Sequence, residues 1–148
     1  IEARSWVGTK FQHQGRVKRT NNHYGGCDCL GLLVGIAAKF SLKSKNGLSL
    51  IDLDEYNYSK VPDSQYFINK LNRHLNKIPI SQISGGDIAI FNFDENPRHL
   101  AIVSYENYDI SSLSLIHSYF PARKVVEHSF SSEWLEKTHS IYRFNELM

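Results

Sequence analysis

The chain has 148 residues, of which 41% are hydrophobic and 22% are charged, and this length suits one domain with its own core. The 17 Lys and Arg against 15 Asp and Glu leave a net charge of only +2, and no apolar run is long enough to cross a bilayer. We therefore expect neither a nucleic-acid partner nor a membrane span.

The first third of the sequence predicts two helices separated by a loop. Residues 2–7 favour a short helix that Gly8 ends, and the loop from Thr9 to Gly26 is rich in Gly, Asn, Gln and basic residues. From Asp28 onward the apolar residues recur at helical spacing as far as Phe40. We predict a buried helix over 28–40, with Asp28 as its N-cap and a flexible Gly25–Gly26 pair leading into it.

The middle of the sequence predicts a surface excursion and a second amphipathic helix. Residues 43–62 are polar and rich in turn-forming residues. Ser64 then stands where an N-cap is expected, and the helix ends near Pro79. Its predicted apolar side consists of Phe67, Ile68, Leu71 and Leu75.

The second half of the sequence is typical of strands. Residues 95–98 are turn-like, Ser131 and Ser132 precede a short helix that contains Trp134, and neither a repeat nor a linker occurs. Helices come first and strands second, with connections too short for parallel crossovers. The sequence therefore predicts a single α+β domain over 1–148, with N-terminal helices packed on an antiparallel sheet. The predicted strands are 87–93, 99–105, 113–119, 123–130 and 139–145.

The two cysteines, Cys27 and Cys29, allow three interpretations. A disulfide between residues so close at a helix start fits the known geometry badly. A zinc site needs about four ligands, and the chain has no CxxC or HxxxH spacing. The third interpretation is a nucleophile. Cys29 falls on the first helical turn, where the helix dipole and unpaired N–H groups favour the reactive thiolate, so we predict Cys29 as the nucleophile.

A cysteine nucleophile needs a base and a group that orients the base. His99 shares a strand face with Ala101 and Val103, small side chains suited to packing on the cysteine helix. His117 lies in the next strand and supplies a ring nitrogen that orients His99. A histidine in a strand is more often structural than catalytic, and the pairing with Cys29 is what favours function here.

Five segments together resemble the NlpC family of papain-like cysteine peptidases, and more narrowly its phage and gene-transfer-agent branch of cell-wall peptidases. The resemblance covers about residues 3–143, nearly the whole chain. The segments are Gly8-Thr-Lys-Phe-Gln-His-Gln-Gly-Arg16, Asp28-Cys-Leu-Gly-Leu32, Gly86-Asp87, Arg98-His-Leu-Ala-Ile102 and Ile116-His117.

The resemblance implies a papain-like, NlpC-type fold and a Cys-His-His triad without a metal or other cofactor. Cys29 is then the nucleophile, His99 the base and His117 the residue that orients it. The family cleaves peptidoglycan stem peptides, often between D-glutamate or γ-D-glutamate and the diamino acid. This implies a partner in the bacterial cell wall or periplasm, or a protein carried with phage-tail or gene-transfer-agent components.

Further residues follow from the same resemblance. Many members carry Tyr-x-Trp-Gly-Gly where this chain has Phe11-Gln-His-Gln-Gly15, so Phe11 lacks the hydroxyl and is interpreted as a core aromatic. His13 or Gln14 then replaces it as a polar donor near the sulfur. Arg98 is a candidate for a stem-peptide carboxylate. Asp28 is a cap that can also face a substrate amine, and Cys27 matches no required position.

Two other classes of function remain open at this stage. The same triad serves amidases, deamidases and acyltransferases, because the acceptor depends on the walls of the pocket. A noncatalytic module that binds wall fragments or assembles into a phage tail is the other. Its hallmark is loss of the cysteine or the histidine, and the sequence keeps both.

Overall fold

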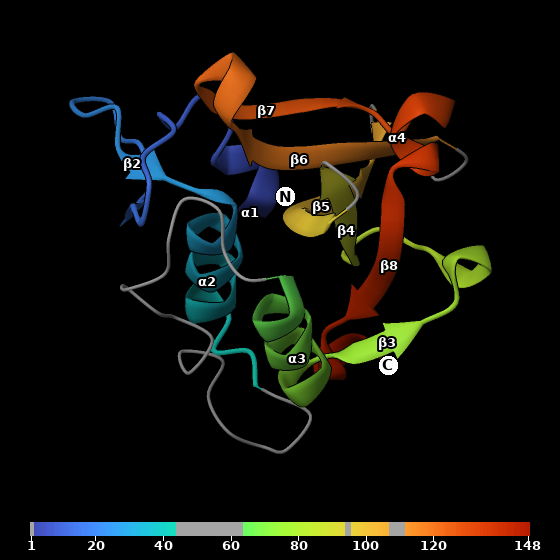
Figure 1. Ribbon diagram of the computed structural model, residues 1–148. Coiled ribbons are helices and arrows are strands. Elements are labelled where there is room, and N and C mark those ends of the chain that lie inside the picture. The colour runs from blue at the N-terminus through green and yellow to red at the C-terminus, as the bar shows by residue number, and fades with distance from the viewer. Residues whose placement is uncertain (1, 44–63, 94–95, 107–111) are drawn as a thin grey trace.

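The computed structural model describes residues 2–43, 64–93, 96–106 and 112–148 (Figure 1). Its helices are α1 (Glu2–Ser5), α2 (Cys29–Lys39), α3 (Ser64–His74) and α4 (Ser132–Glu136). Its strands are β1 (Arg16–Val17), β2 (Gly26–Cys27), β3 (Asn76–Ile78), β4 (Ile88–Phe93), β5 (Asn96–Tyr105), β6 (Leu113–Tyr119), β7 (Lys124–Ser129) and β8 (Thr138–Arg143).

Helix α2 forms where the apolar spacing predicted it. Asp28 is the N-cap, and its carboxylate accepts a hydrogen bond from the backbone N–H of Gly31 at 2.8 Å. A side chain at Gly31 would collide with the carbonyl oxygen of Gly15, so the missing Cβ lets the loop pack closely against the first turn. The start of α2 is thus fixed from two sides.

The region before and after α3 departs from the predictions. The excursion predicted over 43–62 lies almost entirely outside the described residues. Helix α3 ends at His74 rather than near Pro79, because the chain turns into β3, which pairs with β8 through Ile78 opposite Ile141. The predicted loop over 9–26 also contains β1 and part of a small ribbon that β1 forms with β2.

The predicted antiparallel sheet is confirmed. Six of the described strands form one sheet in the order β3-β8-β4-β5-β6-β7, and every neighbouring pair is antiparallel. Residues 96–98, predicted as part of a turn, instead begin β5. Figure 1 shows α2 and α3 together beside the curved sheet, with α4 close to one end of β8. This is the α+β architecture that the sequence predicted.

The sheet has two buried faces with different partners. On the face that we call the helix face, Leu100, Ile102 and Ile116 join the apolar side of α2 in one core cluster. The opposite face carries a second cluster that includes Ala101 and Val103. The prediction that these two residues pack on the cysteine helix is therefore wrong, because alternation along β5 sends them to the other side.

The turn before β4 is a structural anchor. Gly86 has a positive φ of 94°, and the fully buried Asp87 follows it. The Asp87 carboxylate accepts two hydrogen bonds from the Arg143 guanidinium, at 2.7 and 2.9 Å, and one from the backbone N–H of Ser84 at 2.8 Å. Asp87 therefore ties β8 to the start of β4.

In the part of the chain that the structure describes, no helix combines the length and the apolar character that crossing a membrane requires.

Candidate active site

Cys29 occupies the first position of α2, and its thiol lies beside β5. The side chain is partly exposed, and the backbone N–H of Leu100 is a hydrogen-bond donor to its sulfur. Leu100 directly follows His99 in β5. The start of the helix and the strand that carries the predicted base are thus brought together, as the interpretation of Cys29 as nucleophile requires.

The protonation state of Cys29 differs from the prediction. Burial, with the nearby Asp28 carboxylate as the second cause, raises the pKa of the thiol to about 12. Hydrogen bonds from the backbone of Leu100 and Leu30 lower it, but they are the smaller effects. The free protein therefore holds a neutral thiol at neutral pH, and the helix start alone does not create a thiolate. Attack by this sulfur needs a base that removes the proton.

Asp28 has a structural role that uses both of its oxygens. Besides the bond from Gly31, Oδ2 accepts from the backbone N–H of Gln14 at 2.8 Å, and Oδ1 accepts from Arg16 Nη1 at 3.2 Å. The residue is only 5% exposed. These contacts make Asp28 the clamp between the loop and α2, and they support the capping role over contact with a substrate amine.

The two predicted histidines are in direct contact. His99 Nε2 and His117 Nδ1 are 2.6 Å apart, and the residues are 7% and 0% exposed. The β5–β6 register pairs Ile102 with Ile116, so the two histidines lie diagonally on the same sheet face, opposite the helix face. We call this the histidine face. His117 is positioned to orient the ring of His99.

Aromatic side chains surround these rings. Phe93 stacks on His99 with centroids 5.2 Å apart, and Tyr119 stacks on His117 at 4.9 Å. Trp134 of α4 meets His117 edge-on at 5.1 Å. Because this environment is poor in water, burial lowers the pKa of His99 to about 3 and that of His117 to about 2, and neighbouring histidines add to the effect. Both imidazoles are neutral at neutral pH, as an acceptor of the thiol proton must be.

A third histidine, His128, extends the pair of His99 and His117 into a row of three, and it was not predicted from the sequence. His117 Nε2 lies 2.7 Å from Nε2 of His128, which comes from β7. The β6–β7 register pairs His117 with Val126, so His128 is again one diagonal step away on the histidine face. Alternation in residues 123–130 could have placed His128 on the same side as Val126, but only the register of the β6–β7 hairpin brings it to His117.

Cys27 is built into the structure around it. It is fully buried at the end of β2, and its carbonyl oxygen accepts hydrogen bonds from Ser118 Oγ at 2.7 Å and from the backbone N–H of Gln12 at 3.0 Å. Burial raises the pKa of its thiol to about 12. Both cysteines are free thiols. The backbone of Cys27 thus holds the loop against β6.

The other predicted site residues have mixed positions. His13 and Gln14 lie in the turn closed by the hydrogen bond from Gly15 N–H to the carbonyl of Gln12, at 2.9 Å, next to the start of α2. The backbone N–H of Gln14 donates to the Asp28 carboxylate, so this group does not serve as the predicted polar donor near the sulfur. The backbone of Arg98 belongs to β5, whereas its side chain lies outside the described atoms.

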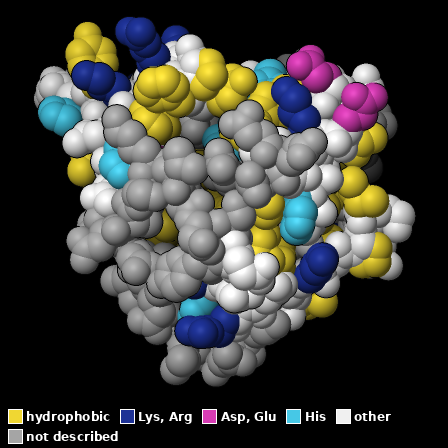
Figure 2. All heavy atoms as spheres, in the orientation of Figure 1, with side chains coloured by type: hydrophobic (Ala, Val, Ile, Leu, Met, Phe, Trp, Pro, Cys, Tyr) yellow, Lys and Arg dark blue, Asp and Glu magenta, His cyan; other side chains and the backbone are white. Residues whose placement is uncertain are grey.

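Phe11 packs against an aromatic ring, but it is half-buried and lies outside both core clusters, so its interpretation as a core aromatic is wrong. Its ring meets Phe120 edge-on with centroids 5.3 Å apart. Phe120 is 66% exposed in the turn between β6 and β7. Figure 2 shows hydrophobic side chains gathered over this turn, with Lys and Arg side chains beside them and acidic side chains over α4. Phe11 therefore supports an exposed aromatic edge.

Metal binding finds no support in the described residues, where no group of three or more His, Cys, Asp and Glu side chains could hold an ion. The three histidines do not form a metal site either. Nε2 of His99 and both ring nitrogens of His117 are used in hydrogen bonds between the histidines, so they do not point together at one ion.

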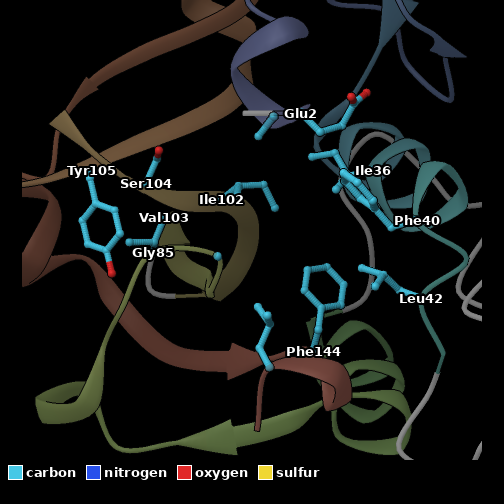
Figure 3. Close-up of a pocket in the computed structure, with 13 residues that line it drawn as sticks. Glu2, Ile36, Phe40, Leu42, Gly85, Ile102, Val103, Ser104, Tyr105 and Phe144 are labelled. Atoms are coloured by element: carbon cyan, nitrogen blue, oxygen red, sulfur yellow. The ribbon is translucent and has the colours of Figure 1, made fainter. Parts of the chain in front are cut away.

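The walls of a cavity of about 540 Å³ contain none of the histidines (Figure 3). It opens beside the helix face of β5, near the C-terminal residues, and its walls are mainly apolar. None of the predicted site residues lines it. The residues that do include Glu2, Ile36, Phe40, Leu42, Ile102, Tyr105, Phe144 and Leu147.

No known protein-family profile and no curated protein sequence matches the chain. Solved structures do. The NlpC/p60 domain of the peptidoglycan hydrolase SagA matches with a TM-score of 0.58 at 18% identity, over 97% of this chain and 93% of that one.

Two longer proteins match as well. An NlpC/P60 family protein from Bacillus cereus ATCC 10987 gives a TM-score of 0.61 at 15% identity over 96% of this chain. A lipoprotein-like NLP/P60 family protein from Staphylococcus aureus subsp. aureus Mu50 gives 0.56 at 17% identity over 97%. The chain spans 37% and 39% of their respective lengths. The fold is thus that of NlpC/P60 proteins, as the sequence resemblance implied.

Proposed function

We propose that the chain is a cysteine hydrolase of bacterial peptidoglycan, and more specifically an endopeptidase that cleaves stem peptides between a γ-D-glutamyl residue and the diamino acid. The observation that carries the proposal is the contact between the start of α2 and β5. It supports the proposal because the backbone N–H of Leu100 donates to the Cys29 sulfur, and the preceding residue, His99, has its Nε2 2.6 Å from Nδ1 of His117.

The first chemical step follows from the protonation states. His99 takes the thiol proton while the sulfur of Cys29 attacks the scissile carbonyl, because neither group is ionised beforehand. Since Nε2 of His99 is bonded to His117, Nδ1 is the ring nitrogen that remains to accept the proton. The imidazolium then protonates the leaving amine, and a thioester to Cys29 remains.

The second half of the reaction reverses these roles. His99 removes a proton from water, the hydroxide attacks the thioester, and the carboxylic acid product and the thiol are released. The backbone N–H of Cys29, in the first turn of α2, is a candidate donor to the oxyanion. His117 keeps the ring of His99 in place during both halves.

The choice of substrate rests on the resemblance of the sequence and on the likeness in fold to a peptidoglycan hydrolase domain. The phage and gene-transfer-agent branch, with partners from a phage-like particle, remains part of the proposal.

The test is to incubate the chain with purified peptidoglycan and identify the new ends by mass spectrometry. The proposal expects free γ-D-glutamyl carboxylates and free amino groups on the diamino acid. Loss of the bond between muramic acid and the stem peptide would identify an amidase, and transfer of the acyl group to an added amine would identify an acyltransferase. Either result would replace the endopeptidase assignment.

Two matched controls separate catalysis from binding and from metal chemistry. His99→Ala is expected to abolish release of these ends while leaving peptidoglycan binding intact. EDTA is expected to leave the rate unchanged, and a loss that zinc restores would contradict the proposed mechanism. Full activity of His99→Ala would exclude His99 as the base, whereas a wild-type chain that binds peptidoglycan and releases no new ends would be a wall-binding module.

A further inference from the structure

The row of histidines continues past the predicted triad and ends on a backbone carbonyl. His99 Nε2 meets His117 Nδ1 at 2.6 Å, and His117 Nε2 meets His128 Nε2 at 2.7 Å. At the outer end, His128 Nδ1 lies 3.0 Å from the carbonyl oxygen of Ser129. Three imidazoles from β5, β6 and β7 are thus linked in series.

The carbonyl fixes the direction of every hydrogen bond in this series. A carbonyl oxygen only accepts, so Nδ1 of His128 carries the proton. A neutral imidazole has one N–H, so in the neutral form of His128 its Nε2 accepts from the Nε2–H of His117. By the same rule Nδ1 of His117 accepts from the Nε2–H of His99. The series therefore leaves Nδ1 of His99 without a proton.

We propose that His128 is a positioning residue that, anchored on the Ser129 carbonyl, sets the tautomers of His117 and His99 so that Nδ1 of His99 is the base for Cys29. This inference rests on the proposed function for its catalytic consequence, whereas the tautomers themselves are a property of the folded chain.

The surroundings of His128 keep the series in one arrangement. The ring centroid of Trp134 lies 5.2 Å from that of His128 and 5.1 Å from that of His117, and Tyr119 stacks on His117. These contacts oppose rotation of the two rings. Protonation of His99 during the reaction does not disturb the series, because its Nε2–H donates to His117 in both states.

Nitrogen-15 NMR of histidine-labelled protein tests the tautomers directly, with Cys29→Ala as a stable background. The expected result is an N–H on Nε2 of His99 and of His117, and on Nδ1 of His128. A proton on Nε2 of His128 would overturn the proposal. This readout does not depend on the substrate, so it separates failure of this inference from failure of the proposed function.

Three substitutions at His128 then test its effect on the rate. In His128→Gln the amide can donate to the Ser129 carbonyl and accept from His117, so activity is expected within about threefold of wild type. His128→Leu removes the anchor, and His128→Lys offers only donors, which oppose the required direction. Both are expected to lose at least about tenfold in kcat, since a base held in the wrong tautomer loses activity strongly.

The control separates tautomer setting from packing. His139→Leu alters a histidine of β8 that bonds Ser140 Oγ and is not part of the series, and it is expected to leave kcat unchanged. If His128 acted only as a packed ring, His128→Gln would be impaired like His128→Leu. Equal activity of His128→Gln and His128→Leu would therefore overturn the proposal.

Discussion

Cys27 and Cys29 are separated by one residue, and the regions around them differ sharply. Cys27 ends β2, is fully buried and is held through its carbonyl by Ser118. Cys29 begins α2, is partly exposed and lies against the backbone of Leu100. Burial raises the pKa of both thiols to about 12. Acidity therefore does not distinguish the two cysteines.

What distinguishes them is the strand that each cysteine contacts. Cys29 accepts a hydrogen bond from the backbone N–H of Leu100, the residue after His99 in β5, whereas the contacts of Cys27 are with the loop and with Ser118. The comparison teaches that a helix start does not by itself lower the pKa of a thiol, so the mechanism that we propose for Cys29 needs a base to take its proton.

The largest expected effect on activity comes from replacing each of the two cysteines by alanine in separate variants. Cys29→Ala is expected to lower muropeptide hydrolysis by at least about a thousandfold, because it removes the nucleophile. Cys27→Ala is expected to keep most of the activity and to lower the free energy of unfolding by about 1 kcal/mol, through loss of a buried side-chain atom. Rates of product release and urea denaturation measure the two effects. If Cys27→Ala lost its hydrolytic activity and Cys29→Ala kept it, the nucleophile would be Cys27 and not Cys29.

The neutral histidines near Cys29 predict a loss of stability in acid. Below the ordinary histidine pKa of about 6.5, the unfolded chain binds a proton at His99 and at His117. The folded chain does so only near pH 3 and pH 2. Folding stability is thus fully present above pH 6.5 and falls as the pH decreases, by about 1.4 kcal/mol per pH unit for each ring.

Denaturation curves between pH 7 and pH 5 check this dependence. A loss of about 4 kcal/mol is expected from the two rings together over this interval. The variant with both His99→Gln and His117→Gln is expected to lose this part of the dependence. An identical slope in the variant and the wild type would show that the buried imidazoles are not its source.

The third prediction concerns the thiol of Cys29 in the free protein. With its pKa near 12, it is expected to contribute no thiolate absorbance in the ultraviolet at pH 7, in a Cys27→Ala background. The absorbance is expected to rise only well above pH 9. The control is the variant that carries both Cys27→Ala and Cys29→Ala. Thiolate absorbance at pH 7 that is present in Cys27→Ala and absent from this control would instead indicate a preformed ion pair of Cys29 with His99.

The smallest effect is expected from Asp28→Asn. Removing the carboxylate charge takes away one cause of the raised pKa of Cys29, so thiolate is expected at a lower pH than in the wild type. The amide oxygen can still accept from Gly31, but the NH2 group cannot accept from the backbone N–H of Gln14, and the bond with Arg16 loses its charge. We expect a cost of about 1–2 kcal/mol in unfolding free energy. Thiolate titration and denaturation measure both. An unchanged titration would exclude Asp28 as a determinant of the thiol.

The sequence predicted the elements that depend on local patterns. The apolar spacing after Asp28 predicted α2 and its cap, and alternation predicted β4 to β8 nearly to their ends. It failed at β3, whose three residues form a strand only because β8 provides a partner. Short runs carry too little periodicity to reveal such pairing.

The candidate site divides in the same way. The sequence by itself determined a cysteine at a helix start and two strand histidines, because these follow from residue type and period. Only the tertiary structure decided the face on which His99 lies, the entry of His128 into the row and the neutral state of Cys29. These depend on strand register and burial, which arise when distant segments pack together.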